Sequence, residues 1–219
     1  MKIKLGVAVI VLALAGVPLF AQQTAVITNI VGKVQLKAQG SDWVNATAGA
    51  TVGTGTFVST GFNSSAVLDL GTSQIQVKQL TRMRLDDLLR SGNNATTSLF
   101  LAVGQVHANV DNSAGLVQNF TLNSPVSTAA VRGTIFDFDG VHVVVERGVV
   151  QFFNQLLQSR SVAAGESSTL NGLSLPDAPA DVNQQQSTVA SETSSQGGGT
   201  GQINLNGPAT TGSAFITVE

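Results

Sequence analysis

SPVSTAAVRGTIFDFDGVHVVVERGVVQFFN, residues 124–154, combines the densest apolar alternation of the chain with its strongest turn signal. The dipeptide Asp139-Gly140 separates two alternating segments, and Asp-Gly favours the positive φ that a two-residue hairpin turn requires. Such a turn predicts one register, whose core face holds three pairs: Phe138 with Val141, Phe136 with Val143, and Thr134 with Val145. We therefore expect a β-hairpin here.

Just upstream of this hairpin, the apolar alternation changes phase. Ala129 and Val131 have the opposite parity to Phe136 and Phe138, so one extra residue must be absorbed if both pairs point inward. A glycine that suits a bulge lies in the intervening segment, residues 132–134. We predict that this segment forms a bend within one strand.

The composition favours an all-β chain and excludes several kinds of chemistry. Charged residues make up 11% of the 219 residues and glycine occurs 23 times, which suits short strands and tight turns. The absence of cysteine excludes disulfides, thiolate metal sites and a cysteine nucleophile. Without Lys2 and Lys4, nine basic residues face thirteen acidic ones, a net charge of −4 that argues against a nucleic-acid partner.

The first 21 residues have the features of a secretory signal peptide. Lys2 and Lys4 precede an apolar run from Leu5 to Val17, and polar residues follow Ala21. The run is short for a bilayer span, so we expect cleavage after Ala21; an uncleaved leader would be the alternative and the only membrane attachment. The leader predicts a periplasmic or secreted protein.

Residues 22–175 are expected to form one domain of short strands joined by Gly, Asn and Ser turns. Residues 65–78, SAVLDLGTSQIQVK, predict a second hairpin. Residues 98–110, SLFLAVGQVHANV, turn at Gly104 and direct His107 toward water. The pattern leaves two architectures open, an irregular β-sandwich and a twisted β-solenoid.

Three glycine-led triplets open strands at unequal spacings: Gly32-Lys33-Val34, Gly104-Gln105-Val106 and Gly148-Val149-Val150. They indicate recurring strand starts without a fixed-period repeat. Beyond Leu175 the composition becomes polar and repetitive, as in NQQQSTVASETSSQGGGTGQ at residues 183–202. We interpret residues 176–219 as a flexible, disordered tail.

Two consecutive segments, AVRGTIFDF at residues 130–138 and VHVVVERGVVQF at residues 141–152, resemble the signature of the FecR domain family. Residues 60–85 and the VGKVQL segment at residues 31–36 resemble earlier parts of that domain, so the resemblance spans roughly residues 27–165. It implies an all-β periplasmic domain; the name-giving members relay a signal from an outer-membrane transporter to a cytoplasmic sigma factor. For this chain it implies a free-standing, exported version.

The residues singled out from this motif are assigned structural roles. They are Val131, Arg132, Gly133, Thr134, Phe136, Asp139, Gly140 and Gly148. The hairpin register places Arg132 opposite Arg147, and directly opposed like charges are unfavourable. We therefore expect Arg132 to lean toward a carboxylate or toward free backbone carbonyls.

Residues with catalytic or metal-binding chemistry are few. Asp137, Asp139 and His142 are close in sequence, but the acidic residue that closes a calcium loop is missing and the turn accounts for Asp139. No GxSxG elbow surrounds a serine. Asp86-Asp87 beside Arg84 are interpreted as a solvated strand end. We predict no enzymatic activity, no cofactor and no metal.

The predicted function is a binding or signal-relay module that contacts another protein of the cell envelope. Recognition of a glycan such as peptidoglycan is the alternative, but it would require exposed aromatic platforms, and the chain has one tryptophan, Trp43, and no tyrosine. A structural envelope protein is a third possibility. Lys78, Arg82 and Arg84 share a parity and are interpreted as a solvated basic stripe that blunts a sheet edge.

Overall fold

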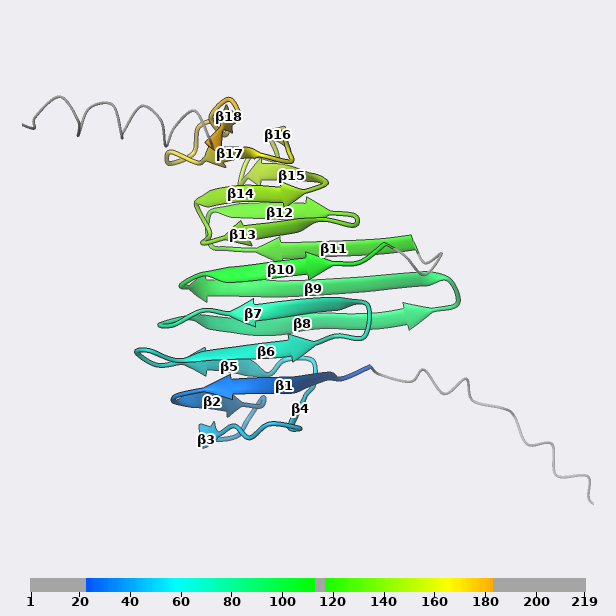
Figure 1. Ribbon diagram of the computed structural model, residues 1–219, viewed down its shortest axis with the longest axis vertical. Helices are drawn as coiled ribbons and strands as arrows, with labels where there is room; N and C mark the ends of the chain where they lie inside the picture. Colours follow the sequence, from blue (N-terminus) through cyan, green and yellow to red (C-terminus); the bar gives the residue numbers. More distant parts are fainter. Residues whose placement is uncertain (1–22, 113–116, 183–219) are drawn as a thin grey trace, which may run out of the picture. The chain divides into compact units, whose positions relative to one another are not determined.

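The computed structural model describes residues 23–112 and 117–182, which form eighteen β-strands in two nine-stranded sheets (Figure 1). Sheet A contains, in spatial order, β18 (Ala180–Asp181), β17 (Glu166–Thr169), β14 (His142–Arg147), β13 (Ile135–Phe138), β10 (Val106–Val110), β7 (Ser73–Val77), β6 (Ser65–Asp69), β1 (Ala25–Val31) and β4 (Thr51–Val52). Sheet B contains β16 (Ser159–Ala163), β15 (Val149–Asn154), β12 (Ser127–Val131), β11 (Val117–Asn123), β9 (Asn94–Val103), β8 (Arg82–Ser91), β5 (Phe57–Thr60), β2 (Val34–Lys37) and β3 (Val44–Asn45). The predicted all-β fold is confirmed.

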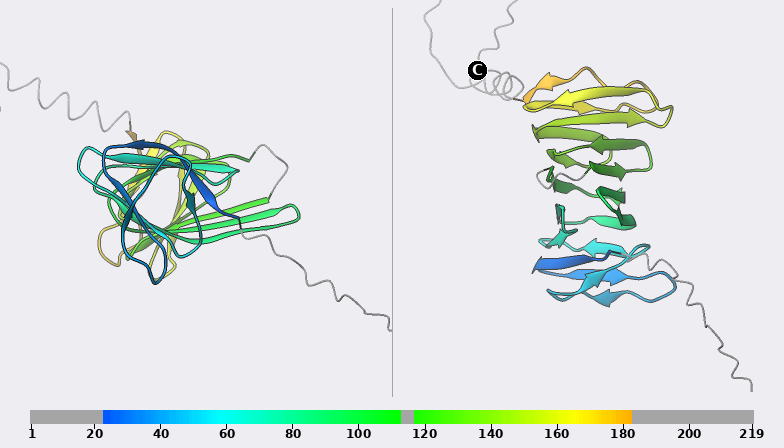
Figure 2. Two further views of the ribbon diagram at one scale, coloured as in Figure 1. Left: turned by 90° about the horizontal axis from the view of Figure 1, so that it is seen from below. Right: turned by 90° about the vertical axis from the view of Figure 1, so that its right-hand side faces the viewer.

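The architecture combines features of both expected alternatives. The two sheets face each other as in a sandwich (Figure 2). The chain also crosses between them repeatedly, mostly after every second strand, so both sheets grow in nearly the same order as the sequence, as in a solenoid. Neighbouring strands are antiparallel, with β9 and β11 as the parallel pair among the described strands.

One hydrophobic core fills the space between the sheets. Its largest fully buried side chains include four phenylalanines, Phe120, Phe136, Phe138 and Phe152. Phe120 meets Phe136 edge to face at 6.4 Å, and Phe138 meets Phe152 in the same way at 6.2 Å. Each pair joins a strand of sheet B to β13 of sheet A, so the segment with the densest alternation also holds the sheets together.

The central hairpin forms, but its predicted register is wrong. Its core-facing pairs are Phe136 with Val145 and Phe138 with Val143. The Asp139 carboxylate Oδ1 accepts hydrogen bonds from the backbone N–H groups of Val141 (3.0 Å) and His142 (2.7 Å), which closes a longer turn. Gly140 has a positive φ of 98°, whereas Asp139 has none. The other predicted core-face residues are buried, because a shift of two residues preserves parity, but Val141, expected opposite Phe138, lies in the turn and is 43% exposed.

The predicted bend at residues 132–134 is instead a crossover between the sheets. β12 lies in sheet B and β13 in sheet A, so Val131 and Phe136 both point inward from opposite sides of the core. This explains the change of phase in the sequence without a bulge at Gly133. A bulge does occur in β14, where Glu146 is the extra residue between the partners of Ile135 and Phe136.

The three glycine-led triplets share a structural role. Each glycine has a positive φ and lies where the chain crosses between sheets, against a hydroxyl residue of a neighbouring crossover: Gly32 against Ser64, Gly104 against Thr81, and Gly148 against Thr134. A Cβ on these glycines would lie 2.4, 2.3 and 2.9 Å, respectively, from the hydroxyl oxygen. Only glycine fits this contact without a shift of the neighbour.

The hydroxyl in each contact binds the backbone of the residue after the glycine. Ser64 Oγ accepts from the Lys33 N–H at 2.8 Å, and Thr81 Oγ1 accepts from the Gln105 N–H at 3.0 Å. Thr134 Oγ1 donates to the Val149 carbonyl at 3.1 Å. We call these three contacts the glycine–hydroxyl locks.

The folded part of the chain continues past Leu175. Backbone N–H groups of Asp177 and Val182 donate to the carbonyls of Thr169 and Gly165, at 2.9 and 3.0 Å, and β18 pairs with β17. The expected leader and most of the expected tail, residues 183–219, lie outside the described residues. Within the described part, no helix is long and apolar enough to cross a membrane.

Candidate binding surfaces

The residues chosen from the sequence motif lie at two neighbouring crossovers and one turn. Val131, Thr134 and Phe136 are buried, Gly133 and Gly148 lie at crossovers, and Asp139 and Gly140 form the hairpin turn. Arg132 is exposed, and its Nη2 donates to Asn119 Oδ1 at 3.1 Å, not to a carboxylate or a backbone carbonyl. Arg147 pairs with Ile135 and does not oppose Arg132.

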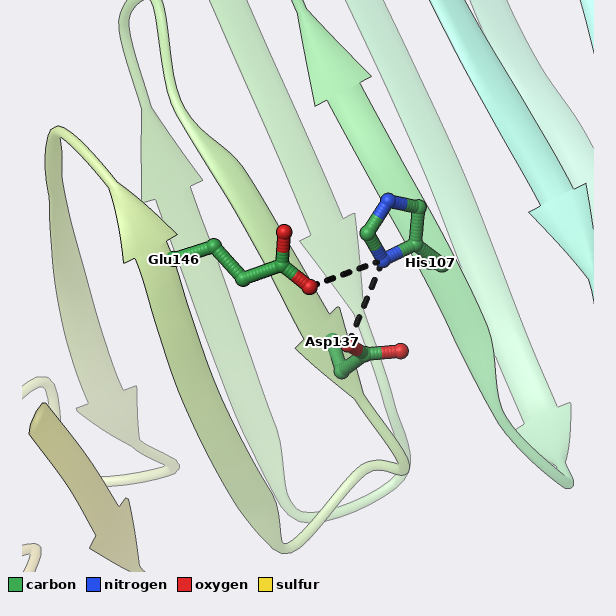
Figure 3. A group of neighbouring side chains, drawn as sticks. All are labelled: His107, Asp137 and Glu146. Carbon is green, nitrogen blue, oxygen red and sulfur yellow. Dashed lines mark hydrogen bonds and ion pairs between the residues drawn. The ribbon is translucent and has the colours of Figure 1, made fainter. Parts of the chain in front are cut away.

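A polar cluster lies on the outer face of sheet A, where β10, β13 and β14 are neighbours (Figure 3). His107 Nδ1 is 3.2 Å from Asp137 Oδ2 and 3.8 Å from Glu146 Oε1. His107 points outward, as the alternation predicts. The bulge in β14 supplies Glu146, which the sequence analysis did not identify.

This polar cluster contains the right atoms to hold a divalent cation. One ligand atom from each residue lies within 4.8 Å of the others, and imidazole with two carboxylates is a donor set that zinc accepts. Glu146 is 54% exposed, however, and His107 and Asp137 already form a cross-strand contact without a metal. The cluster therefore has a sufficient structural explanation as a surface hydrogen-bond network.

The sequence-derived candidates Asp137, Asp139 and His142 do not form a common site. Asp139 closes the hairpin turn, and His142 Nδ1 lies 2.9 Å from Thr169 Oγ1 on β17. Asp137 lies opposite His107 of β10 on one side and opposite Val144 of β14 on the other.

A second surface lies on the outer face of sheet B and combines aromatic rings with cations. Direct cross-strand partners alternate between the two types of side chain over four neighbouring strands: Lys37 on β2, Phe57 on β5, Arg84 on β8 and Phe100 on β9. Trp43 lies 6.4 Å from Phe57, and Arg82 lies over Trp43. We call these six residues the aromatic–cation surface.

The cations of this surface rest on the rings. Arg84 Cζ lies 5.4 Å from the Phe57 centroid and 5.3 Å from the Phe100 centroid. Arg82 Cζ and Lys37 Nζ lie 5.3 and 6.0 Å from the Trp43 ring. All four distances are within the range of a cation–π attraction.

Arg84 is the one member of the surface with an ion pair in the described residues. Its Nε donates to Asp86 Oδ1, and this side-chain hydrogen bond raises the pKa of the Arg84 guanidinium. A depression of about 410 Å³ lies beside it, lined by Lys37, Phe57 and Arg84 together with Gly55 and residues 38–40. The surface thus offers fixed positive charge next to a shallow groove.

The sequence indicated only a fragment of this surface. Arg82 and Arg84 share a face as predicted, but β8 is an inner strand of sheet B, so they do not blunt an edge. Lys78 follows β7 of sheet A, and the crossover at Thr81 separates it from them. The sequence did not identify Phe57 and Phe100 as part of this surface. Alternation predicts that their side chains point outward, but it does not show which strands lie next to theirs.

Comparison with known proteins identifies part of the chain. The family model described as FecR protein matches residues 56–151, which run from the residue before β5 into β15. No curated protein matches the chain. Two crystal structures of a "putative anti-sigma factor" from Parabacteroides distasonis ATCC 8503 are similar, each with 16% identity and a TM-score of 0.47.

Those two matches cover 61% of this chain and 64% and 63% of the other protein, so the likeness spans less than two thirds of that protein's length. The family match, in contrast, includes both segments whose sequence resembles the FecR signature, apart from the final residue, Phe152. It also includes two of the three glycine–hydroxyl locks. The chain therefore carries a FecR domain at residues 56–151.

Proposed function

We propose that this protein is an exported, non-enzymatic module that binds another protein of the cell envelope and relays or responds to a signal through that contact. The FecR domain at residues 56–151 is the observation that carries the proposal. It supports a regulatory role based on protein contact. The leader, with Lys2 and Lys4 before an apolar run, supports export.

The mode of contact follows from how the sheets end. Three of the four edge strands, β3, β4 and β18, have two residues each and offer few unpaired backbone groups to an added strand. β16 at the fourth edge has five residues, and one of them, Arg160, donates from its side-chain Nε to the Pro176 carbonyl. The outward faces are larger than these edges, which favours contact through a sheet face.

In-cell photo-crosslinking tests the proposal. Crosslinkers at Gln35 and Ser59 probe the outer face of sheet B, and a crosslinker at Gln74 probes the outer face of sheet A. We expect one envelope protein to be captured reproducibly from sheet B and not from sheet A. Capture of no protein from any position, with saturable binding to isolated peptidoglycan, would move the assignment to glycan recognition.

A further inference from the structure

The aromatic–cation surface is better suited to binding negative charge than to stacking against a sugar, because cations cover its aromatic rings. Each of its three rings has at least one cation within 6.0 Å of its centroid. A guanidinium or ammonium group on a ring occupies the position that a stacked sugar would take. The N–H groups of the cations remain available, and they select negatively charged hydrogen-bond acceptors.

The charge on this surface is concentrated and largely unpaired. Three of the nine basic residues that follow the leader lie here, although the chain without its leader has an excess of acidic residues. Lys37 and Arg82 form no ion pair within residues 23–112 and 117–182. Arg84 uses Nε for Asp86, which leaves the N–H donors of its two terminal nitrogens.

The spacing of the cations matches an extended peptide. Arg82 and Arg84 are alternate residues of β8, so their Cα atoms are about 7 Å apart, the same repeat as alternate residues of another extended chain. Lys37 lies two strands away across β5, at about 10 Å. Carboxylates on alternate residues of a bound segment that runs along β8 would therefore face Arg82 and Arg84 together, while Lys37 adds positive charge at one side of the segment.

We propose that the aromatic–cation surface docks an extended acidic segment of the partner protein, with Asp or Glu on alternate residues. This inference rests on the proposed function and specifies the chemistry of the partner. The chain's own residues 183–219 do not fit the role, because their two acidic residues, Glu192 and Glu219, are far apart in sequence. The occupant is thus a segment of another protein.

A direct binding experiment uses the full mature chain and a defined probe. The probe is a fluorescent peptide with Glu at alternate positions and Ser between them; the comparison peptide has Gln in place of Glu. We expect fluorescence anisotropy to show saturable binding of the Glu peptide, weakened by salt, and no binding of the Gln peptide. The triple variant Lys37→Gln, Arg82→Gln, Arg84→Gln should bind the Glu peptide at least about fivefold more weakly.

Two further variants separate local from general effects. Lys33→Gln, Arg90→Gln, Arg147→Gln removes the same charge from exposed positions elsewhere and should bind like the unmodified protein. The double variant Lys37→Gln, Arg82→Gln keeps the Arg84–Asp86 pair and guards against a folding defect in the triple variant. It should still lose affinity, with an unchanged melting temperature.

Three outcomes would overturn the inference: no binding of the Glu peptide, equal losses in the two triple variants, or binding of isolated peptidoglycan in place of the peptide. If the Glu peptide does not bind while crosslinkers capture an envelope protein, the proposed protein-binding function stands. Only the inference that the partner segment is acidic is then contradicted. If neither experiment detects a protein contact, the proposed function itself fails.

Discussion

Gly104 shows how a single backbone position can limit what this fold tolerates. Its φ is 98°, and a Cβ there would lie 2.3 Å from Thr81 Oγ1 and 2.5 Å from Thr81 Cα. The second contact is with backbone, so a change of the threonine rotamer would not relieve it. The sequence identified this glycine as a strand start, but the neighbour it touches is 23 residues away in the chain and belongs to another crossover.

Gly104→Ala should therefore lower the free energy of unfolding by about 2–5 kcal/mol, from left-handed backbone strain of about 1–2 kcal/mol and overpacking of about 1–3 kcal/mol. Gly71→Ala is the matched control, because Gly71 has a φ of 86° but nothing within 4 Å of an added Cβ. It should lose only the backbone part. Equal losses in urea denaturation would show that the close approach to Thr81 contributes nothing.

At the scale of elements, the sequence predicted the strands and core face of residues 124–154 but not the turn or the sheets. Alternation shows which side chains point inward, and this held for Phe136 and Phe138. It does not show to which of two facing sheets a strand belongs, so a crossover at Gly133 was indistinguishable from a bulge. The turn was mispredicted because the Asp139 side chain, and not positive φ at Asp139, closes it.

Phe136→Ala tests the role of β13 in joining the sheets. Phe136 is fully buried and meets Phe120 of sheet B edge to face, so its loss should destabilise the domain by about 3–5 kcal/mol. Phe153→Ala is the control, since Phe153 lies on the outward side of β15 and is only partly buried. Its cost in chemical denaturation should be clearly smaller; comparable costs would contradict the assignment of Phe136 to the core.

At the scale of the whole molecule, the sequence predicted only that Arg82 and Arg84 share a face, and not the rest of the aromatic–cation surface. Its cross-strand row takes one residue from each of β2, β5, β8 and β9, and strands of sheet A interrupt this series along the chain. Only the order of strands within sheet B brings Lys37 next to Phe57 and Phe57 next to Arg84. The net charge gave no indication of this surface either, because a chain with more acidic than basic residues is not expected to carry a cationic surface.

The N-terminal leader predicts that the protein is exported from the cytoplasm. The leader predicts a mature N-terminus at Gln22, so mass spectrometry of protein isolated from the periplasm or the medium should find no intact Met1. Replacing Leu12 and Leu14 by Asp would interrupt the apolar run and should retain the protein in the cytoplasm with its leader. Normal export of that variant would show that the leader does not direct secretion.

The glycine–hydroxyl locks have a consequence for how the domain holds together. Each lock joins two crossovers that are adjacent in the stack of strands, so it transmits stability between neighbouring layers and no further. The locks thus add a series of nearest-neighbour interactions to the single hydrophobic core between the sheets. We therefore expect the gain or loss of a pair of strands at an end to leave the locks of the remaining layers intact.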